Sequence, residues 1–287
     1  MSETYDRRVT PARPDLAAAH LKGVVTASRY VEGATYQVRE GVIDMRRDPR
    51  PDCAVDTQLL YGERVTLYDE EEGWGWVQAA RDEYVGWVPL NALWSRNDPP
   101  THRVAVARTF IYPGPSIKLP PLIAVPLCSD VTIVEERGDF LVTPEQGFLW
   151  RAHLAPLDRP ASDFVAMAET LIGVPYLWGG KSSLGIDCSG LVQVSLLAGG
   201  FGAPRDSDMQ AAGLGDPLAP DAPLRRGDLV FWKGHVGIMR DATTLLHANG
   251  SHMLVSSEPL AHVRERNLAG GAGDITVIRR LQSYGVK

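Results

Sequence analysis

The sequence has few cysteines, no long apolar run and no excess of basic residues. Its three cysteines, Cys53, Cys128 and Cys188, are far apart in the 287-residue chain, so they predict neither a disulfide framework nor a metal site. No apolar run is long enough to span a bilayer, and the first residues lack the apolar core of a secretory signal. The net charge of −6 argues against nucleic acid or an anionic membrane as a partner. We therefore expect a cytoplasmic protein without a metal or other cofactor.

The composition is that of a globular protein with more than one domain. Hydrophobic residues make up 44% of the chain and charged residues 22%, and the length allows two or three domains. Proline-rich joints at residues 97–100 and 156–160 predict the boundaries. We expect an N-terminal arm with a short helix over residues 15–24, capped by Asp15. The predicted domains are residues 1–35 (arm), 36–97 (first barrel), 98–158 (second barrel) and 159–287 (catalytic domain).

Residues 36–157 show short alternating strands and tight turns in a layout that occurs twice. Residues 65–67 (Val-Thr-Leu) line up with 131–133 (Val-Thr-Ile), and residues 86–89 line up with 148–151. The repetition predicts an internal duplication of a small β-barrel. Both modules resemble bacterial SH3 (SH3b) domains, which end in a Gly-Trp-Val-like strand.

The stretch from residue 173 to 192 changes from a glycine-rich loop to a helix. Asp187 is a natural N-cap, which places Cys188 in the first turn. The positive end of the helix dipole favours a thiolate there, and a thiolate is a nucleophile. The small residues Ser189 and Gly190 leave room for a substrate carbonyl and for N–H donors to an oxyanion. The alternative is a small structural cysteine buried at a helix start.

The last part of the chain places helical patterns before strand-like runs, which predicts an α+β domain. A helical stripe over residues 164–171, with Ser162 or Asp163 as cap, and a short helix near residue 207 come first. Runs at residues 228–232, 235–239, 243–247 and 275–278 follow. If residues 235–239 and 243–247 form a hairpin, His235 and His247 meet at one end. One imidazole can then act as a base toward Cys188 while the other fixes its tautomer. The alternative is a pair of structural histidines.

Five segments in the second half resemble the successive signatures of NlpC/P60 cysteine peptidases, in that family's order and spacing. They are residues 176–180, 187–192, 226–232, 234–238 and 247–248, within a match of about 160–282. The resemblance implies a papain-like α+β fold that hydrolyses the γ-D-glutamyl–diamino acid bond of bacterial wall peptides. It implies Cys188 as nucleophile, His235 as general base and acid, and His247 as third polar group.

The same resemblance implies a substrate cleft around the nucleophile. Tyr176 corresponds to a tyrosine whose hydroxyl helps to stabilise the oxyanion, and Asp187 and Ser189 match positions that line the cleft. Trp178 is expected as a wall of the cleft, with core packing as the alternative.

Arg205 and Ser207 match an Arg-x-Ser segment that contacts the D-glutamyl part of the substrate. A guanidinium can grip the free α-carboxylate with two hydrogen bonds. The alternatives are a surface pair of Arg205 with Asp206 or Asp208, and an Asp187 that only caps its helix.

Two SH3b-like modules ahead of the catalytic domain resemble the cytoplasmic dipeptidyl-peptidases that process murein peptides. In that branch the first module covers the cleft and recognises a free N-terminal L-Ala through an acidic residue and a tyrosine. Glu63 and Tyr84 are the matching residues here. We therefore expect murein-derived peptides as partners and L-Ala-γ-D-Glu as the product. The alternatives are a general wall hydrolase or amidase of the superfamily, or an inactive wall-peptide-binding protein; the choice between meso-diaminopimelate and lysine stays open.

Overall fold

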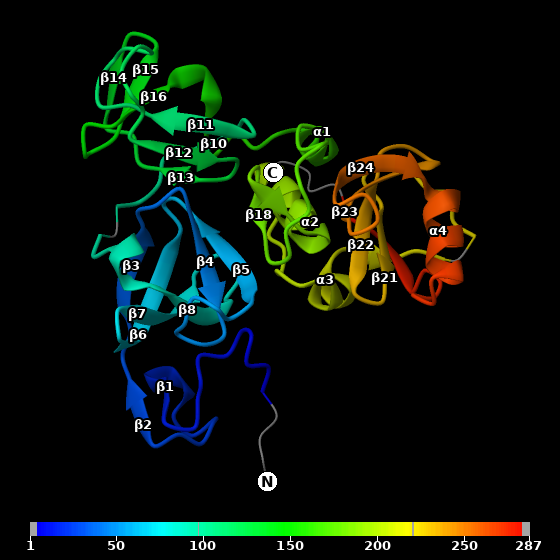
Figure 1. The fold of residues 1–287 in the computed structure, drawn as a ribbon, viewed down its shortest axis with the longest axis horizontal. Helices are drawn as coiled ribbons and strands as arrows, with labels where there is room; N and C mark the ends of the chain where they lie inside the picture. The colour runs from blue at the N-terminus through cyan, green and yellow to red at the C-terminus, as the bar shows by residue number, and fades with distance from the viewer. Residues whose placement is uncertain (1–4, 97, 220, 283–287) are drawn as a thin grey trace. The chain divides into compact units, whose positions relative to one another are not determined.

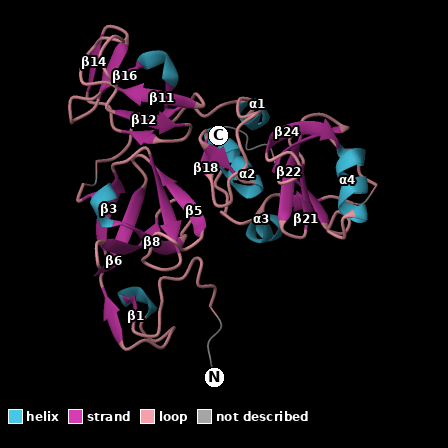
Figure 2. Ribbon diagram, viewed as in Figure 1, coloured by secondary structure: helices cyan, strands magenta, loops and turns pink. Residues whose placement is uncertain are grey.

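The chain divides into two compact units, Met1–Arg159 and Pro160–Lys287 (Figure 1). The computed structural model describes residues 5–96, 98–219 and 221–282. The first unit consists mostly of strands, and the second combines helices with a sheet (Figure 2). Among the helices that these residues form, none has the length and apolar character needed to cross a membrane.

The helix predicted over residues 15–24 is wrong. The chain forms a short strand β1 (Leu16–Ala18), a single 3-10 turn η1 (Ala19–Leu21), and a parallel pairing of β1 with β2 (Arg29–Val31). All three residues of β1 are buried, so this segment has no exposed helical face. The carboxylate of Asp15 accepts hydrogen bonds from Arg13 instead of capping a helix.

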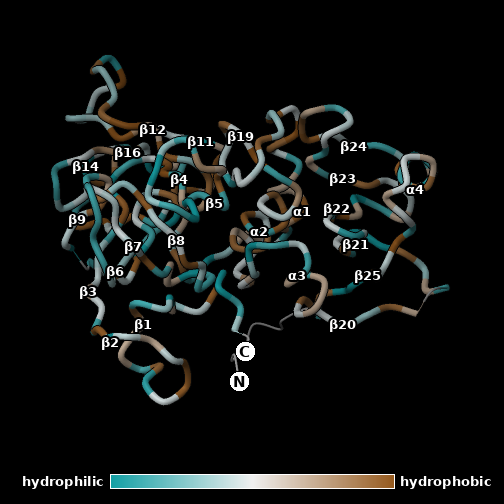
Figure 3. Tube along the Cα trace, turned by 60° about the horizontal axis from the view of Figure 1, so that its bottom comes forward, coloured by the Kyte–Doolittle hydropathy of each residue, from teal (hydrophilic) through white to brown (hydrophobic). Residues whose placement is uncertain are grey.

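The first barrel is a seven-stranded sheet in the order β5-β4-β8-β7-β6-β3-β9. Hydrophobic and hydrophilic residues alternate along its strands (Figure 3). The hydrophobic side chains point inward and form the barrel core. Residues 72–73 join β6 to β7, and residues 80–84 join β7 to β8. The strands are β3 (Ala34–Val38), β4 (Val42–Arg46), β5 (Val55–Leu60), β6 (Arg64–Glu71), β7 (Trp74–Ala79), β8 (Val85–Pro89) and β9 (Leu93–Trp94).

The second module is built from three smaller sheets, β13-β10-β17, β11-β12 and β14-β15-β16. It ends as the first module does. A 3-10 turn, η2 (Leu90–Ala92), separates β8 from β9, and η3 (Arg151–His153) separates β16 from β17. This shared ending supports the predicted duplication. The strands are β10 (His102–Val104), β11 (Arg108–Ile111), β12 (Ile123–Pro126), β13 (Asp130–Val131), β14 (Glu135–Arg137), β15 (Phe140–Val142), β16 (Phe148–Trp150) and β17 (Leu154–Pro156).

The second unit opens with the helices that its sequence predicts. Helix α1 (Phe164–Glu169) is capped by Asp163, whose carboxylate accepts from the N–H groups of Val165 and Ala166 at 2.9 and 3.2 Å. Helix α2 (Cys188–Ala198) follows a hairpin of β18 (Lys181–Ser182) and β19 (Gly185–Ile186), and α3 (Ser207–Gly213) comes next.

A six-stranded sheet in the order β20-β25-β21-β22-β23-β24 completes the second unit, and α2 contacts β22 and β23. The predicted hairpin is confirmed, because β22 pairs with β23 in antiparallel register. The α+β class is confirmed as well. Strand β24 and helix α4 (Leu260–Ala269) were not predicted. The strands are β20 (Asp216–Pro217), β21 (Leu229–Trp232), β22 (His235–Met239), β23 (Thr244–Asn249), β24 (Leu254–Pro259) and β25 (Val277–Arg280).

Candidate active site

Cys188 is the first residue of α2, as the sequence predicts. The carboxylate of Asp187 caps this helix by accepting from the N–H of Gly190 at 2.7 Å. The Cys188 side chain is buried, and its sulfur accepts hydrogen bonds from the backbone N–H groups of Val236 and Ser189. The thiol therefore lies between the start of α2 and the start of β22, with two N–H donors directed at it.

The expected preference for a thiolate is not what the folded site provides. Burial raises the pKa of the Cys188 thiol to about 12, and the charge of Asp187 adds to the rise. The backbone donors and Arg205 act in the opposite direction, but they are outweighed. Cys188 is thus a neutral thiol near pH 7, and a neutral thiol must lose its proton before it can act as a nucleophile.

His235 and His247 lie in direct contact. His235 opens β22, His247 lies in β23, and His235 Nε2 is 2.8 Å from His247 Nδ1. Because His235 Nε2 is engaged in this way, Nδ1 is the ring nitrogen of His235 that can accept another proton. The indole of Trp232, the cross-strand partner of His235, packs with its centroid 5.8 Å from the imidazole.

Both imidazoles are neutral at rest. The protein packed around His235 lowers its pKa to about 3, and His247 and Arg266 add to the fall. Burial also lowers the pKa of His247, against the attraction of Glu258. A neutral imidazole can act as a general base, and a neutral thiol needs a base before it can act as a nucleophile.

A carboxylate that sequence reasoning missed completes the polar chain. His247 Nε2 is 2.9 Å from Glu258 Oε1. Arg266 donates to both carboxylate oxygens of Glu258, at 2.8 and 2.7 Å. Glu258 lies in β24 and Arg266 in α4, and neither element was predicted from the sequence. A signal was present, since Pro259 ahead of the apolar pair Leu260 and Val263 is typical of a helix start.

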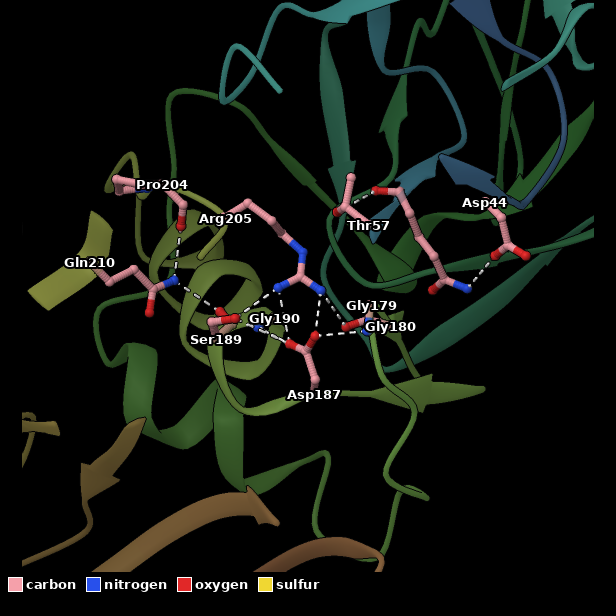
Figure 4. Close-up of polar contacts among 11 residues, drawn as sticks. Asp44, Thr57, Gly179, Gly180, Asp187, Ser189, Gly190, Pro204, Arg205 and Gln210 are labelled. Carbon is pink, nitrogen blue, oxygen red and sulfur yellow. Dashed lines mark hydrogen bonds and ion pairs between the residues drawn. The ribbon is translucent and has the colours of Figure 1, made fainter. Parts of the chain in front are cut away.

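Arg205, Asp187 and Ser189 form one buried network (Figure 4). Arg205 Nη1 and Nη2 donate to the two Asp187 oxygens at 3.0 and 2.7 Å, and Nη1 also donates to Ser189 Oγ at 2.8 Å. The Arg205 side chain is 1% exposed, so the alternative of a surface pair is wrong. Asp187 does more than cap α2, because it also holds Arg205 and accepts from the N–H of Gly179.

Gln210 fastens this network to the segment before α3. Its amide donates to the backbone carbonyls of Ser189 and Pro204, at 3.0 and 2.8 Å (Figure 4). The start of α2 and the Arg205 segment are therefore held to each other by buried hydrogen bonds.

Tyr176, Trp178 and Ser207 are the other predicted site residues of the second unit, and they differ in burial. Burial raises the pKa of the Tyr176 hydroxyl, and the negative charges of Asp187 and of an ionised Cys188 add to the rise. Trp178 is 68% exposed, which removes core packing as an explanation for it. Ser207 is half-buried at the first position of α3.

Glu63 and Tyr84 belong to the first unit and have partners within it. Glu63 is buried, and its carboxylate accepts from Arg81 Nη1 at 2.6 Å and from the N–H of Leu60. Arg81 also donates to Asp130 at 2.8 Å, so it links the two SH3-like modules. Tyr84 packs in the core of the first barrel and lines a cavity of about 560 Å³. Their predicted contact with substrate stays a prediction.

Two family models match the chain in the expected order. The bacterial dipeptidyl-peptidase SH3 domain matches residues 45–93, and the NlpC/P60 family matches residues 173–269. The second match contains Cys188, His235, His247 and the unpredicted Glu258 and Arg266.

Relatives and solved structures agree with these matches. A gamma-D-glutamyl-L-lysine dipeptidyl-peptidase of Bacillus subtilis (strain 168) is 31% identical, over 79% of this chain and 81% of its own length. A protein of the same name from Bacillus cereus is 27% identical, over 72% and 71%. The crystal structure of an NlpC/P60 family protein from Bacillus cereus superposes with a TM-score of 0.72 at 22% identity, covering 86% of this chain and 99% of that one. With a relative this similar along most of both sequences, the chain belongs to the NlpC/P60 family of cysteine peptidases.

Proposed function

We propose that this peptidase hydrolyses the γ-D-glutamyl–diamino acid bond of murein peptides that begin with a free L-Ala, and releases L-Ala-γ-D-Glu. The observation that carries the proposal is the buried Cys188 at the start of α2, beside the strand whose His235 is hydrogen-bonded to His247. The relatives named gamma-D-glutamyl-L-lysine dipeptidyl-peptidase support this substrate class. The three free cysteines suit a reducing cytoplasm, where we place the reaction.

The proposed reaction is acyl transfer in two steps. In the first, the Cys188 thiol gives its proton to His235 Nδ1 and the sulfur attacks the γ-carbonyl carbon. N–H groups at the start of α2 and the Tyr176 hydroxyl stabilise the oxyanion. The C–N bond then breaks, and the imidazolium of His235 protonates the leaving amine. In the second step water gives a proton to His235 and attacks the thioester carbon. The C–S bond then breaks, and the sulfur takes the proton back from His235, which restores the neutral thiol and the neutral imidazole.

The predicted grip of Arg205 on the D-glutamyl α-carboxylate by two hydrogen bonds is wrong, because both of its Nη atoms already donate to Asp187 and its side chain is 1% exposed. Its proposed part in substrate recognition is to hold its neighbours in place. Arg205 orders Asp187 and Ser189 by three hydrogen bonds, which fixes the polar groups beside the nucleophile. Ser207 and Trp178 are proposed to complete this part of the cleft, with Trp178 offering an exposed indole to the peptide.

A second candidate is a family hydrolase that is indifferent to the peptide N-terminus. The ion pair between Glu63 and Arg81 favours it, because an incoming ammonium would have to compete with a guanidinium 2.6 Å from the carboxylate. Under this alternative the bond cleaved is the same, but blocked and cross-linked peptides are substrates as well.

The two candidates differ in a direct assay. L-Ala-γ-D-Glu-L-Lys and its meso-diaminopimelate counterpart are offered free and N-acetylated, and products are followed by mass spectrometry. We expect release of L-Ala-γ-D-Glu from the free peptides, and cleavage of the acetylated ones at least about 100-fold slower, because a desolvated carboxylate would be left unpaired. Equal rates would establish the second candidate.

The same assay tests the nucleophile. Cys188→Ala abolishes release, whereas Cys53→Ala, a thiol of the first unit, leaves it unchanged. An active Cys188→Ala protein would contradict the proposed function as a whole.

A further inference from the structure

A continuous chain of hydrogen bonds runs from His235 through His247 to Glu258. The two links are 2.8 Å, from His235 Nε2 to His247 Nδ1, and 2.9 Å, from His247 Nε2 to Glu258 Oε1. The three residues come from β22, β23 and β24, and Arg266 of α4 braces the last of them with two hydrogen bonds. The chain therefore depends on four separate elements of the second unit.

The ionised carboxylate at one end decides the direction of every bond in this chain. The hydrogen bonds from Arg266 lower the pKa of Glu258 to about 2, so Glu258 is an acceptor only. His247 must then carry its proton on Nε2, which leaves Nδ1 to accept from His235 Nε2–H. As a result His235 Nδ1 has a free lone pair for the Cys188 thiol.

The hydrogen bond between His247 and Glu258 is largely shielded from water. The His247 side chain is 1% exposed and that of Glu258 is 14% exposed. The charged or titratable groups that face His247 are Glu258 from β24, Arg266 from α4, His235 from β22 and His252 from the connection of β23 to β24. Among them Glu258 alone is an anion.

We propose that Glu258 is a positioning residue of the active site: it fixes the tautomers of His247 and His235, and Arg266 holds it in place. The inference rests on the proposed roles of His235 and His247. When His235 accepts the thiol proton, the negative charge of Glu258 stabilises the imidazolium through His247. Arg266 keeps the proton from moving on to the carboxylate.

The first test replaces the anion by a neutral group of the same shape. In Glu258→Gln the amide can donate to His247 Nε2, which reverses the chain and places a proton on His235 Nδ1. We expect kcat for L-Ala-γ-D-Glu-L-Lys to fall about 10- to 100-fold with KM little changed. Glu258→Asp, which keeps the charge, recovers part of the rate. Glu265→Gln removes a charge at an exposed position of α4 and leaves kcat unchanged.

The second test compares two variants that should shift the acid limb of the pH profile of kcat/KM in opposite directions. Glu258 raises the pKa of both histidines, and Arg266 lowers it. Glu258→Gln therefore moves the acid limb to lower pH, and Arg266→Gln moves it to higher pH. A merely structural role would change both profiles in height and neither in position, and that result would overturn the inference.

The third test observes the histidine tautomers directly and does not depend on peptidase activity. Nitrogen-15 NMR of the ring nitrogens in the Cys188→Ala protein shows both imidazoles protonated on Nε2, and Glu258→Gln in the same background shifts His247 to the Nδ1–H form. Unchanged ring signals would overturn the inference even if the peptidase proposal holds. Activity remaining in Cys188→Ala would overturn the peptidase proposal, while the ring signals would still decide the role of Glu258.

Discussion

Asp187 serves the active site in two ways with a single carboxylate. One oxygen caps α2 through the N–H of Gly190, and both oxygens receive the buried guanidinium of Arg205. The charge of Arg205 is enclosed by protein, so its free energy depends on this partner. Removal of the Asp187 carboxylate should therefore destabilise the whole second unit and not only the start of α2.

We predict that Asp187→Asn lowers the free energy of unfolding of the second unit by about 3–5 kcal/mol, because it leaves a buried cation unpaired. Urea unfolding followed by circular dichroism measures the change. Asp221→Asn, at an exposed loop position, is the matched control and should stay within about 0.5 kcal/mol of the parent protein. A loss no larger than that of the control would mean that the pair does not stabilise the fold.

The depressed pKa of His235 predicts a stability that depends on pH. The folded protein binds a proton on this ring only near pH 3, whereas the unfolded chain binds one near pH 6.5. The unfolded state therefore holds more protons in between, and stability falls as the pH drops below 6.5, by up to about 1.4 kcal/mol per pH unit.

Comparison with His235→Gln isolates this contribution. Between pH 6.5 and 5 most carboxylates stay ionised in both states, so the histidines dominate the slope. We expect the parent protein to lose up to about 2 kcal/mol more than His235→Gln over this interval in urea unfolding. Parallel pH slopes for the two proteins would show that His235 titrates normally in the folded state.

At the scale of elements, the loop before the nucleophile packs directly on the first turn of α2. A Cβ built on Gly190 would lie 2.3 Å from the carbonyl oxygen of Gly180 and 3.0 Å from Asp187 Oδ1. Real Cβ contacts are not this short, so the loop or the helix would have to move. Cys188 is two residues away, and its sulfur depends on the same turn.

We predict that Gly190→Ala destabilises the second unit by about 1–3 kcal/mol and lowers kcat at least 10-fold, because it displaces the first turn of α2. Gly213→Ala, at the end of α3 with no atom within 4 Å of the new Cβ, is the control and should leave both quantities nearly unchanged. Thermal unfolding and the tripeptide assay measure the two effects. Full activity in Gly190→Ala would mean that the nucleophile tolerates movement of the loop.

Elements with a strong local signal were predictable, and those fixed by tertiary contacts were not. The cap at Asp187 and the β22–β23 hairpin follow from residue type and spacing, and the structure confirms both. A cap at Asp15 predicts a helix in the arm, but β1 pairs with β2 and buries all three of its residues instead. Nothing local shows that Glu258 meets His247, because a sheet pairing and the packing of α4 create that contact.

The network around Arg205 illustrates the same limit. The sequence identifies Arg205 as a functional candidate, but its partner could not be read from spacing, since Asp206 and Asp208 are nearer in the chain than Asp187. In the structure the Arg205 guanidinium is buried, and it donates to both carboxylate oxygens of Asp187.

At the scale of the whole molecule, the proposed chemistry and the proposed recognition of the N-terminus lie in different units. Cys188, His235, His247 and Glu258 all belong to Pro160–Lys287, which has its own core around Val230. Glu63 and Tyr84, the residues predicted to recognise a free L-Ala, belong to Met1–Arg159. The two functions should therefore be separable by cutting the chain at residue 160.

We predict that residues 160–287 alone unfold cooperatively and still release L-Ala-γ-D-Glu, because core, nucleophile and polar chain are all retained. The ratio of rates for free and N-acetylated tripeptide should fall from at least about 100 in the full chain to about 1, since no carboxylate remains to be left unpaired by a blocked amine. Mass spectrometry of products from both peptides gives the ratio, and Cys188→Ala in the short chain controls for uncatalysed release. A ratio that survives the truncation would place recognition of the free amine in the catalytic unit and remove Glu63 and Tyr84 from the substrate site.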